Sequence, residues 1–246
     1  MIVEGDSIAE CWLNILNELV IQKKRELSTV ILTINENGAQ PLYKAALESD
    51  LTEFLKSVNQ PSIETTASTI FPISLSGGKT SIFTRYERIW KFVQDESKNR
   101  RGTYFRRLIA YGEKNGTPVN QLKHIIETYN GIPGKRNPVH RRSALIATTF
   151  DPTLDHISTP QLGFPCLQQV CFIPNSQDKT LRMNAIYAMQ YLDTRAYGNY
   201  LGLLRLGKFM ANEMNLEFVQ LNCMLSILEL GRMTKHTAKK LSERYS

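Results

Sequence analysis

The thiol of Cys166 is the first side chain in this sequence whose position suggests covalent chemistry. It follows Pro165 in the stretch GFPCLQQVCF, at the start of an alternating apolar run that is typical of a buried strand. A thiolate at the mouth of a strand can attack an electrophilic carbon of a bound ligand. Free cysteine is also among the most buried residue types, so an inert core thiol is the alternative interpretation.

An attacking thiol needs a cation that favours its ionised form and a second group that moves protons. The adjacent Arg141 and Arg142 can supply the charge. Glu87 lies in the amphipathic stretch RYERIW, where partial burial would raise its carboxyl pKa and suit it to proton exchange. The alternative for Glu87 is a surface helix glutamate in an ordinary salt bridge.

Asn199 is a candidate ligand-binding residue. Its carboxamide presents a donor and an acceptor side by side, so it can hydrogen-bond to a ligand edge that carries one of each. Asparagine is also a good helix N-cap, and Asn199 opens a stretch with helical periodicity. Both roles are compatible with the sequence.

Helices and strands alternate along the chain and would position these groups. Apolar periodicity predicts helices at about 8–25, 41–57, 80–96, 120–129 and 199–215. Strand-like runs cover 28–34, 141–150, 166–174, 181–192 and 217–230, while 59–68 is predicted to be a loop. Helices gathered against a run of strands predict an α+β fold, a single domain over residues 1–246 with one covered sheet face.

Composition narrows the class of protein. The 246 residues are 42% apolar, which is enough for a sizeable core, and no apolar run is long enough to span a bilayer. The first residues lack the basic segment of a secretory signal, and the four cysteines lack metal-like spacing. We therefore expect a cytoplasmic protein without a metal site. The net charge of +7 fits a polyanionic partner, a phosphorylated ligand or solubility alone.

The order of the motifs resembles that of the thymidylate synthase superfamily, which includes the pyrimidine hydroxymethylases. The family's Tyr-Gly, Asp-Gln helix start, Arg-Arg pair, Pro-Cys nucleophile and helix-opening asparagine have counterparts here in Tyr111-Gly112, Asn120-Gln121, Arg141-Arg142, Pro165-Cys166 and Asn199. The resemblance covers about residues 81–230. Residues 1–80 would be a divergent part of the same domain.

This resemblance implies a mixed sheet packed against helices, with one sheet face used for homodimerisation. Cys166 would add to carbon 6 of a pyrimidine nucleotide or nucleoside and so make carbon 5 nucleophilic. Glu87 would move protons around the ring, and Asn199 would read its base edge. The implied reaction is a one-carbon transfer, either methylation or hydroxymethylation of carbon 5.

The resemblance also assigns residues around the ring. Arg141 and Arg142 of the neighbouring subunit would hold the phosphate and keep the thiol ionised. Tyr111 would form part of the pocket wall. Trp90 would contact the one-carbon donor, which in the family is 5,10-methylenetetrahydrofolate.

The sequence departs from the family pattern after the nucleophile. Leu167 and Cys171 occupy the places of the family's histidine and glutamine. Gln168 or Gln169 can substitute for that glutamine, although the two-residue period of a strand allows one of them to face the ligand.

Further departures lie at the sugar and phosphate contacts. The family's Arg-Ser-x-Asp motif has no counterpart, and Arg195 or Arg182 could restore the missing charge. Glu229 stands in place of a sugar-binding histidine and could accept hydrogen bonds from ribose hydroxyls. These losses predict a changed substrate, and they leave open whether folate is used.

Two functions of other classes remain as alternatives. The first is a catalytically silent member of the same fold that binds nucleotides for regulation. The second is a nucleic-acid-binding or RNA-modifying protein, which the net positive charge of the chain suggests. The reactivity of Cys166 separates the first alternative from an enzyme, and salt-dependent oligonucleotide binding tests the second.

Overall fold

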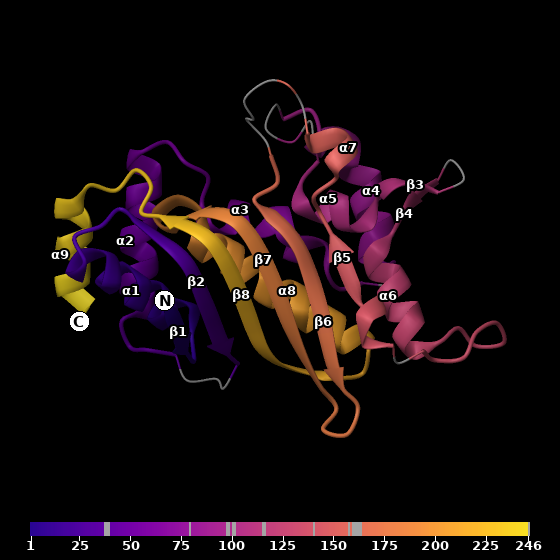
Figure 1. Ribbon diagram of the computed structural model, residues 1–246. Helices are drawn as coiled ribbons and strands as arrows, with labels where there is room; N and C mark the ends of the chain where they lie inside the picture. The colour runs from indigo at the N-terminus through magenta and orange to yellow at the C-terminus, as the bar shows by residue number, and fades with distance from the viewer. Residues whose placement is uncertain are drawn as a thin grey trace.

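The structure is a computed structural model that describes residues 1–36, 40–78, 80–96, 99, 102–114, 117–139, 141–156, 158 and 164–245, except for the side chains of Glu113, Lys114 and Arg142. It has an α+β fold in which a six-stranded mixed sheet packs against helices (Figure 1). None of the helices in this described part of the chain is long and apolar enough to cross a membrane.

The sheet has the strand order β1-β2-β8-β7-β6-β5. Its strands are β1 (Ile2–Gly5), β2 (Glu26–Asn35), β5 (Ile146–Thr148), β6 (Leu167–Asn175), β7 (Thr180–Tyr191) and β8 (Glu217–Glu229). The β1–β2 and β7–β8 pairs are parallel and the other pairs are antiparallel. The start of β6 therefore lies at the end of the sheet where β7 and β8 finish.

Helices alternate with the strands along the chain and pack against the sheet. They are α1 (Ile8–Ile21), α2 (Lys44–Ser57), α3 (Ile63–Ile70), α4 (Ile82–Val93), α5 (Tyr104–Ile109), α6 (Gln121–Asn130), α7 (Pro152–Asp155), α8 (Tyr197–Glu213) and α9 (Lys235–Tyr245). Short 3₁₀ turns cover Ile73–Leu75 and Arg142–Ala144, and a π-helical turn, Leu192–Ala196, joins β7 to α8. A small hairpin consists of β3 (Tyr111–Lys114) and β4 (Thr117–Val119).

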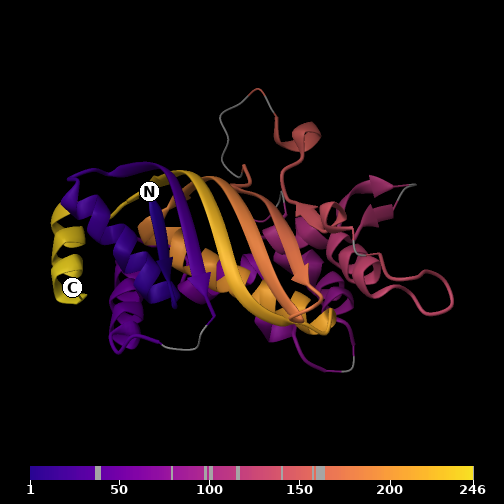
Figure 2. The same ribbon diagram turned by 60° about the horizontal axis from the view of Figure 1, so that its bottom comes forward.

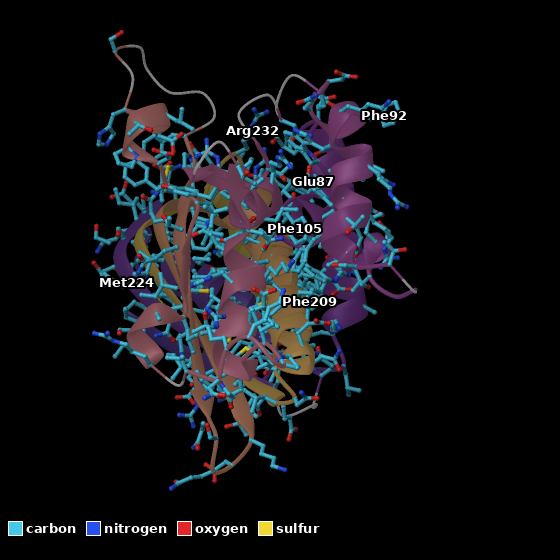
Figure 3. The ribbon with its side chains drawn as sticks, turned by 90° about the vertical axis from the view of Figure 1, so that its right-hand side faces the viewer. Glu87, Phe92, Phe105, Phe209, Met224 and Arg232 are labelled. Carbon is cyan, nitrogen blue, oxygen red and sulfur yellow. The ribbon has the colours of Figure 1, made fainter. Side chains whose placement is uncertain are left out.

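One face of the sheet carries the core and the other face is open. Trp12, Phe172 and Tyr187 are completely buried on the helix-covered side. Figure 3 shows Phe105 and Phe209 between the sheet and the helices, whereas Met224 points away from the opposite face. Met224 is 43% exposed. Figure 2 shows the same arrangement, with α8 beneath the covered face.

Close packing of α8 against α3 fixes the helix that follows β7. A Cβ atom at Gly198 would lie 2.6 Å from the Thr66 side chain, and one at Gly202 would lie 2.7 Å from the Ala67 carbonyl oxygen. Both contacts are too short for a larger residue, so these glycines let the two helices approach each other. The first turn of α8 is thereby held against α3 at the covered face.

The predicted α+β fold is confirmed, whereas several of its elements differ from the prediction. The strand β1, the helices α5 and α9 and the β3–β4 hairpin were not predicted. The predicted loop at 59–68 is wrong, because α3 begins at Ile63 and Ser62 caps it by accepting from the Thr65 N–H. The strand predicted at 141–150 is shorter, because β5 spans Ile146–Thr148 and follows a 3₁₀ turn.

Candidate functional site

Cys166 lies directly before β6, where the ends of β7 and β8 come together. Its carbonyl oxygen accepts a hydrogen bond from the Ala188 N–H at 2.9 Å, which ties it to β7. The side chain is partly buried, and its sulfur lies 4.0 Å from the Phe164 carbonyl oxygen. The thiol is therefore neither sealed in the core nor free in solvent.

Tyr104 and Arg195 form the polar surroundings of this thiol. Tyr104 opens α5, and its hydroxyl lies 3.5 Å from the Leu167 N–H, one residue beyond Cys166. Burial raises the pKa of Cys166, and the positive charge of Arg195 opposes that rise in part. The thiol is accordingly protonated near neutral pH in a single copy of the chain, so a permanently ionised Cys166 would need a further cation.

Arg195 is placed by the π-helical turn between β7 and α8. Its Nη2 atom donates to the Gln60 Oε1 at 3.4 Å. Arg232 lies close by, since its Nη1 donates to the carbonyl oxygen of Val58 at 3.2 Å. Two guanidinium groups therefore flank the Val58–Gln60 segment at the Cys166 end of the sheet.

Asn199 is buried in the first turn of α8, with 4% of its surface exposed. The helix begins at Tyr197 and its N-cap is Ala196, so the interpretation of Asn199 as an N-cap is wrong. The buried, unpartnered side-chain atoms of the described chain do not include those of Asn199. Its carboxamide carries a donor and an acceptor that can bind a ligand edge.

Several buried polar groups near the β7–α8 connection lack protein partners within the described chain. Among the described residues, the Tyr187 and Tyr200 hydroxyls and both amide atoms of Gln190 have none, although all three side chains are at most 2% exposed. Sequence reasoning assigned no role to these residues. The alternation of β7 from Leu181 places Tyr187 on the covered face, but the pattern shifts after Tyr187, so it gives no signal for Gln190.

Glu87 and Trp90 form a separate cluster on α4. The Glu87 carboxylate pairs with Arg106 of α5, and its side chain is 48% exposed. The Arg106 guanidinium also lies over the Trp90 ring, 5.0 Å from its centroid, and Trp90 stacks against Tyr86. No hydrogen bond or ion pair among the described residues joins Glu87 to Cys166, which favours the salt-bridge interpretation of Glu87.

Tyr111 lies behind the thiol. Its hydroxyl donates to the Phe150 carbonyl oxygen at 2.8 Å, and the Phe150 ring packs 5.5 Å from that of Phe164. Burial raises the pKa of Tyr111, and Asp151 adds to the rise. Tyr111 thus supports the segment that contacts Cys166 and is not itself in contact with the sulfur.

A buried ion pair anchors the same segment. Arg107 of α5 donates to both carboxylate oxygens of Asp155 in α7, at 2.6 and 2.8 Å, and to the Thr149 carbonyl oxygen. Arg107 is 8% exposed and Asp155 is 1% exposed. This pair fixes α7 to α5, and the bond to Thr149 ties the residue before Phe150 to the same arginine.

The two glutamines after the nucleophile occupy different places. Gln169 pairs with Thr148 and Ile186 in the sheet, and these residues lie on the open face, away from Asn199. Gln168 instead donates through its Nε2 to the Pro165 carbonyl oxygen, next to Cys166. A bulge between Leu167 and Gln169 produces this difference. The assignment of Gln169 is therefore corrected in favour of Gln168.

The remaining predicted residues surround the site at greater distances. Glu229 ends β8, where it pairs with Tyr191 and Glu26. Arg141 is exposed before the 3₁₀ turn, whereas the Arg142 side chain is outside the described residues. The Phe172 N–H donates to the carbonyl oxygen just after this turn, that of Leu145. Six residues of β6 separate this point from Cys166, about 20 Å along the strand.

Two cavities among the described residues are not lined by Cys166. A cavity of about 360 Å³ lies at the opposite end of β6, within the hairpin from Ile173 to Arg182. A second, of about 10 Å³, is lined by Asp193, Arg195 and Gly198. The residues that the structure describes contain no group of three histidine, cysteine, aspartate or glutamate side chains suited to a metal ion.

The site thus consists of a protonated thiol beside Tyr104, a nearby guanidinium, and buried amide and hydroxyl groups with unused hydrogen-bonding capacity. Comparison with known proteins adds no assignment, since neither a family model nor a curated protein matches the chain.

Proposed function

We propose that this protein binds a pyrimidine nucleotide or nucleoside at the Cys166 end of the sheet and modifies carbon 5 of its ring. The observation that supports this best is the half-buried thiol beside Arg195 at the end of the sheet where α8, which carries the buried Asn199, follows β7. A carboxamide reads the N3–H and O4 edge of uracil, and a thiol adds to the activated carbon 6.

Covalent chemistry can begin with the thiol in its protonated resting form. The sulfur forms a bond to carbon 6, the electrons of the carbon 5–carbon 6 double bond move to carbon 5 and oxygen 4, and the thiol proton passes to water. Tyr104 is suited to hydrogen-bond the developing charge, because burial raises its pKa and keeps its hydroxyl protonated. Carbon 5 then attacks a one-carbon electrophile of the aldehyde class, whose carbonyl oxygen takes a proton from water and becomes a hydroxyl. The carbon 5 proton passes to water, and expulsion of the sulfur as the carbon 5–carbon 6 double bond re-forms restores the ring.

The residues present do not fit 5,10-methylenetetrahydrofolate as the donor. Trp90, the ring assigned to it, carries the Arg106 guanidinium and stacks on Tyr86. Neither of the two cavities described above, beside Arg195 and in the β6–β7 hairpin, is lined by Cys166. We therefore derive no step through folate, and Glu87 has no part in the proposed proton transfers.

A second copy of the chain would complete the site. Arg141 belongs to a turn about 20 Å along β6 from its own Cys166, farther than an arginine side chain extends. An arginine pair supplied by a partner would add the cation that the thiol lacks in one copy. We infer a homodimer with shared sites and a thymidylate-synthase-like fold.

The open sheet face is suited to hold such a dimer together. Ile31, Met224 and Ile186 form an apolar row across three strands of this face. The neighbouring row pairs Thr33 with Asn222 and Asn222 with Asn184, each at 3.0 Å, so part of its hydrogen-bonding capacity is used within the chain. The four long strands β2, β6, β7 and β8 have 10, 9, 12 and 13 residues, which gives a face of about 700 Å², close to the roughly 800 Å² that each partner buries in a stable interface.

Trapping of the adduct tests this function. We would incubate the protein with uracil and cytosine nucleotides tritiated at carbon 5, and with 5-fluoropyrimidine analogues, whose fluorine cannot leave as a cation. Tritium release and a mass increase on the Cys166 peptide are expected, both lost in Cys166→Ala and retained in Cys171→Ala. Cys171 is a matched control because it is a second half-buried thiol of the same strand, on the open face.

A catalytically silent nucleotide-binding protein is the second candidate. It is favoured by the raised pKa of Cys166, which burial dominates, and by the engagement of Glu87 with Arg106. Titration calorimetry with the same nucleotides separates the two. Binding without tritium release or labelling would establish the silent protein and reject the transferase, and absence of binding would reject both.

A further inference from the structure

We propose that the edge of the molecule formed by α9 and the turn between α1 and β2 binds the phosphate backbone of double-stranded nucleic acid. This surface, called the basic edge below, comprises the exposed cations Lys23, Lys24, Arg25, Arg232, Lys235 and Lys240. It lies at the α9 side of the sheet, opposite α4 to α7 (Figure 1). The proposal is independent of the function proposed for Cys166.

Hydrogen bonds hold the three parts of the basic edge together. Lys235 at the start of α9 donates from Nζ to the Lys23 carbonyl oxygen at 2.7 Å. Arg25 donates to the carbonyl oxygens of Gly231 and Met233 in the turn after β8. The turn and the helix therefore present their charges from one continuous surface.

The charges of the basic edge are not neutralised within the described chain. The partners of Arg25, Arg232 and Lys235 are neutral carbonyl oxygens, and none of the six cations forms an ion pair with a described carboxylate. The flanking cations Lys239 and Arg244 differ, since they pair with Glu243 and Asp50. Six uncompensated cations along one edge create a local field that attracts a polyanion.

The first turn of α9 shows the same imbalance. It contains no acidic residue, while Lys235 and His236 occupy it. Positive charge at a helix N-terminus is unfavourable to the helix by itself. A bound row of phosphates would remove this repulsion.

A membrane surface is a poorer match to the basic edge. The apolar residues of α9, Ala238, Leu241 and Tyr245, pack against the core. Ile21 borders the surface as an exposed apolar side chain, but an interfacial helix needs a whole apolar face to enter the bilayer. A charged surface without an apolar face that could enter a bilayer favours nucleic acid over a membrane as the partner.

The shape of the surface favours duplex over single strands. Single-strand binders combine cations with exposed aromatic rings on which bases stack. Tyr245, the aromatic residue of α9, instead packs against the Tyr43 ring at 5.7 Å. Phosphate contacts without stacking predict binding that ignores base sequence.

Salt-dependent anisotropy of a labelled 20-base-pair DNA duplex tests this proposal on the full chain. Six phosphate contacts predict that the logarithm of the association constant falls with the logarithm of salt concentration with a slope of about −5. In the triple variant Lys24→Gln, Lys235→Gln, Lys240→Gln, the slope should fall to about −3, with at least a tenfold loss of affinity at 100 mM salt.

A matched triple variant controls for net charge. Lys91→Gln, Lys123→Gln and Lys208→Gln remove three exposed lysines from α4, α6 and α8 and should leave duplex binding within twofold of the unmodified protein. Circular dichroism of both variants shows whether they remain folded, and release of tritium from nucleotides should be equal in both if the basic edge is separate from the Cys166 site.

Three outcomes would overturn the proposal. These are no duplex binding at 50 mM salt, equal losses in the two triple variants, and binding to phosphatidylserine vesicles with none to the duplex. A single-stranded oligonucleotide that binds more tightly than the duplex would reject the duplex assignment, and equal binding of an RNA duplex is expected because phosphates alone are contacted.

Discussion

At the scale of single residues, Cys166 is governed by two opposed effects. Burial disfavours the thiolate, and the Arg195 guanidinium favours it, with burial the larger of the two. The same residue pair determines how the thiol responds to pH. Arg195 is therefore the residue whose removal reports on the electrostatics of the site without removing the nucleophile.

Replacement of Arg195 by glutamine should raise the pKa of Cys166 further, because burial then acts without its counter-charge. The rate of Cys166 alkylation by iodoacetamide follows the thiolate fraction, so its rise with pH should move to higher pH in Arg195→Gln. Mass spectrometry of the Cys166 peptide across pH 7–10 measures this shift.

Cys171 provides the internal control for this measurement. Its pKa is raised by burial alone, without a contribution from Arg195. Its alkylation profile should be the same in both proteins, and a shift of Cys171 equal to that of Cys166 would show a general loosening of the fold. Unchanged Cys166 reactivity would contradict the proximity of Arg195.

Residue types alone located part of the candidate site. Cys166 and Asn199 were identified from their positions at a strand start and a helix start, which the topology brings to one end of the sheet. The prediction for Glu87 was misleading, because helical periodicity does not distinguish a residue at the rim of a pocket from a surface residue. Glu87 instead pairs with Arg106. Tyr104 was not among the predicted site residues.

At the scale of elements, the Arg107–Asp155 pair holds α7 against α5 and is almost completely buried. We expect Asp155→Ala to lower the free energy of unfolding by about 3–5 kcal/mol, because it leaves the Arg107 charge buried without its partner. The double variant Arg107→Met, Asp155→Leu should recover most of that loss, since no charge remains to be desolvated. Urea denaturation of the single and double variants measures both effects.

The exposed pair of Arg205 and Glu64 is the matched control. It has the same two-bond geometry, at 2.7 and 2.8 Å, but the Glu64 side chain is 63% exposed. Glu64→Ala should cost about 1 kcal/mol or less. Equal losses in Asp155→Ala and Glu64→Ala would show that burial of the α5–α7 pair adds nothing to stability.

Regular elements were predictable where periodicity was long, and not where polar residues interrupt it. The strands at 166–174 and 217–230 and the helix at 199–215 are present within two residues of their predicted ends. The stretch NQPSIETTAS suggested a loop because of its turn-forming residues. This stretch contains the start of α3. Ser62 caps the helix, and Gly198 and Gly202 allow α3 to pack closely against α8. Such a tertiary contact leaves no local signal.

At the scale of the whole molecule, the sheet has one face covered by helices and one face without cover from the described chain (Figure 3). We expect Met224→Glu to convert a homodimer into a monomer. Met224 lies in the middle of the apolar row with Ile31 and Ile186, and each copy would bury a carboxylate against its partner. Sedimentation velocity at micromolar concentrations measures the change in mass.

Leu42→Glu is the control for this substitution, since Leu42 is fully exposed before α2 and outside the sheet face. It should leave the dimer intact. Because Arg141 cannot reach the Cys166 of its own chain, the Met224→Glu monomer should also lose the adduct on Cys166 while retaining its circular dichroism spectrum. A monomeric unmodified protein, or an adduct that persists in the monomer, would show that one copy holds the complete site.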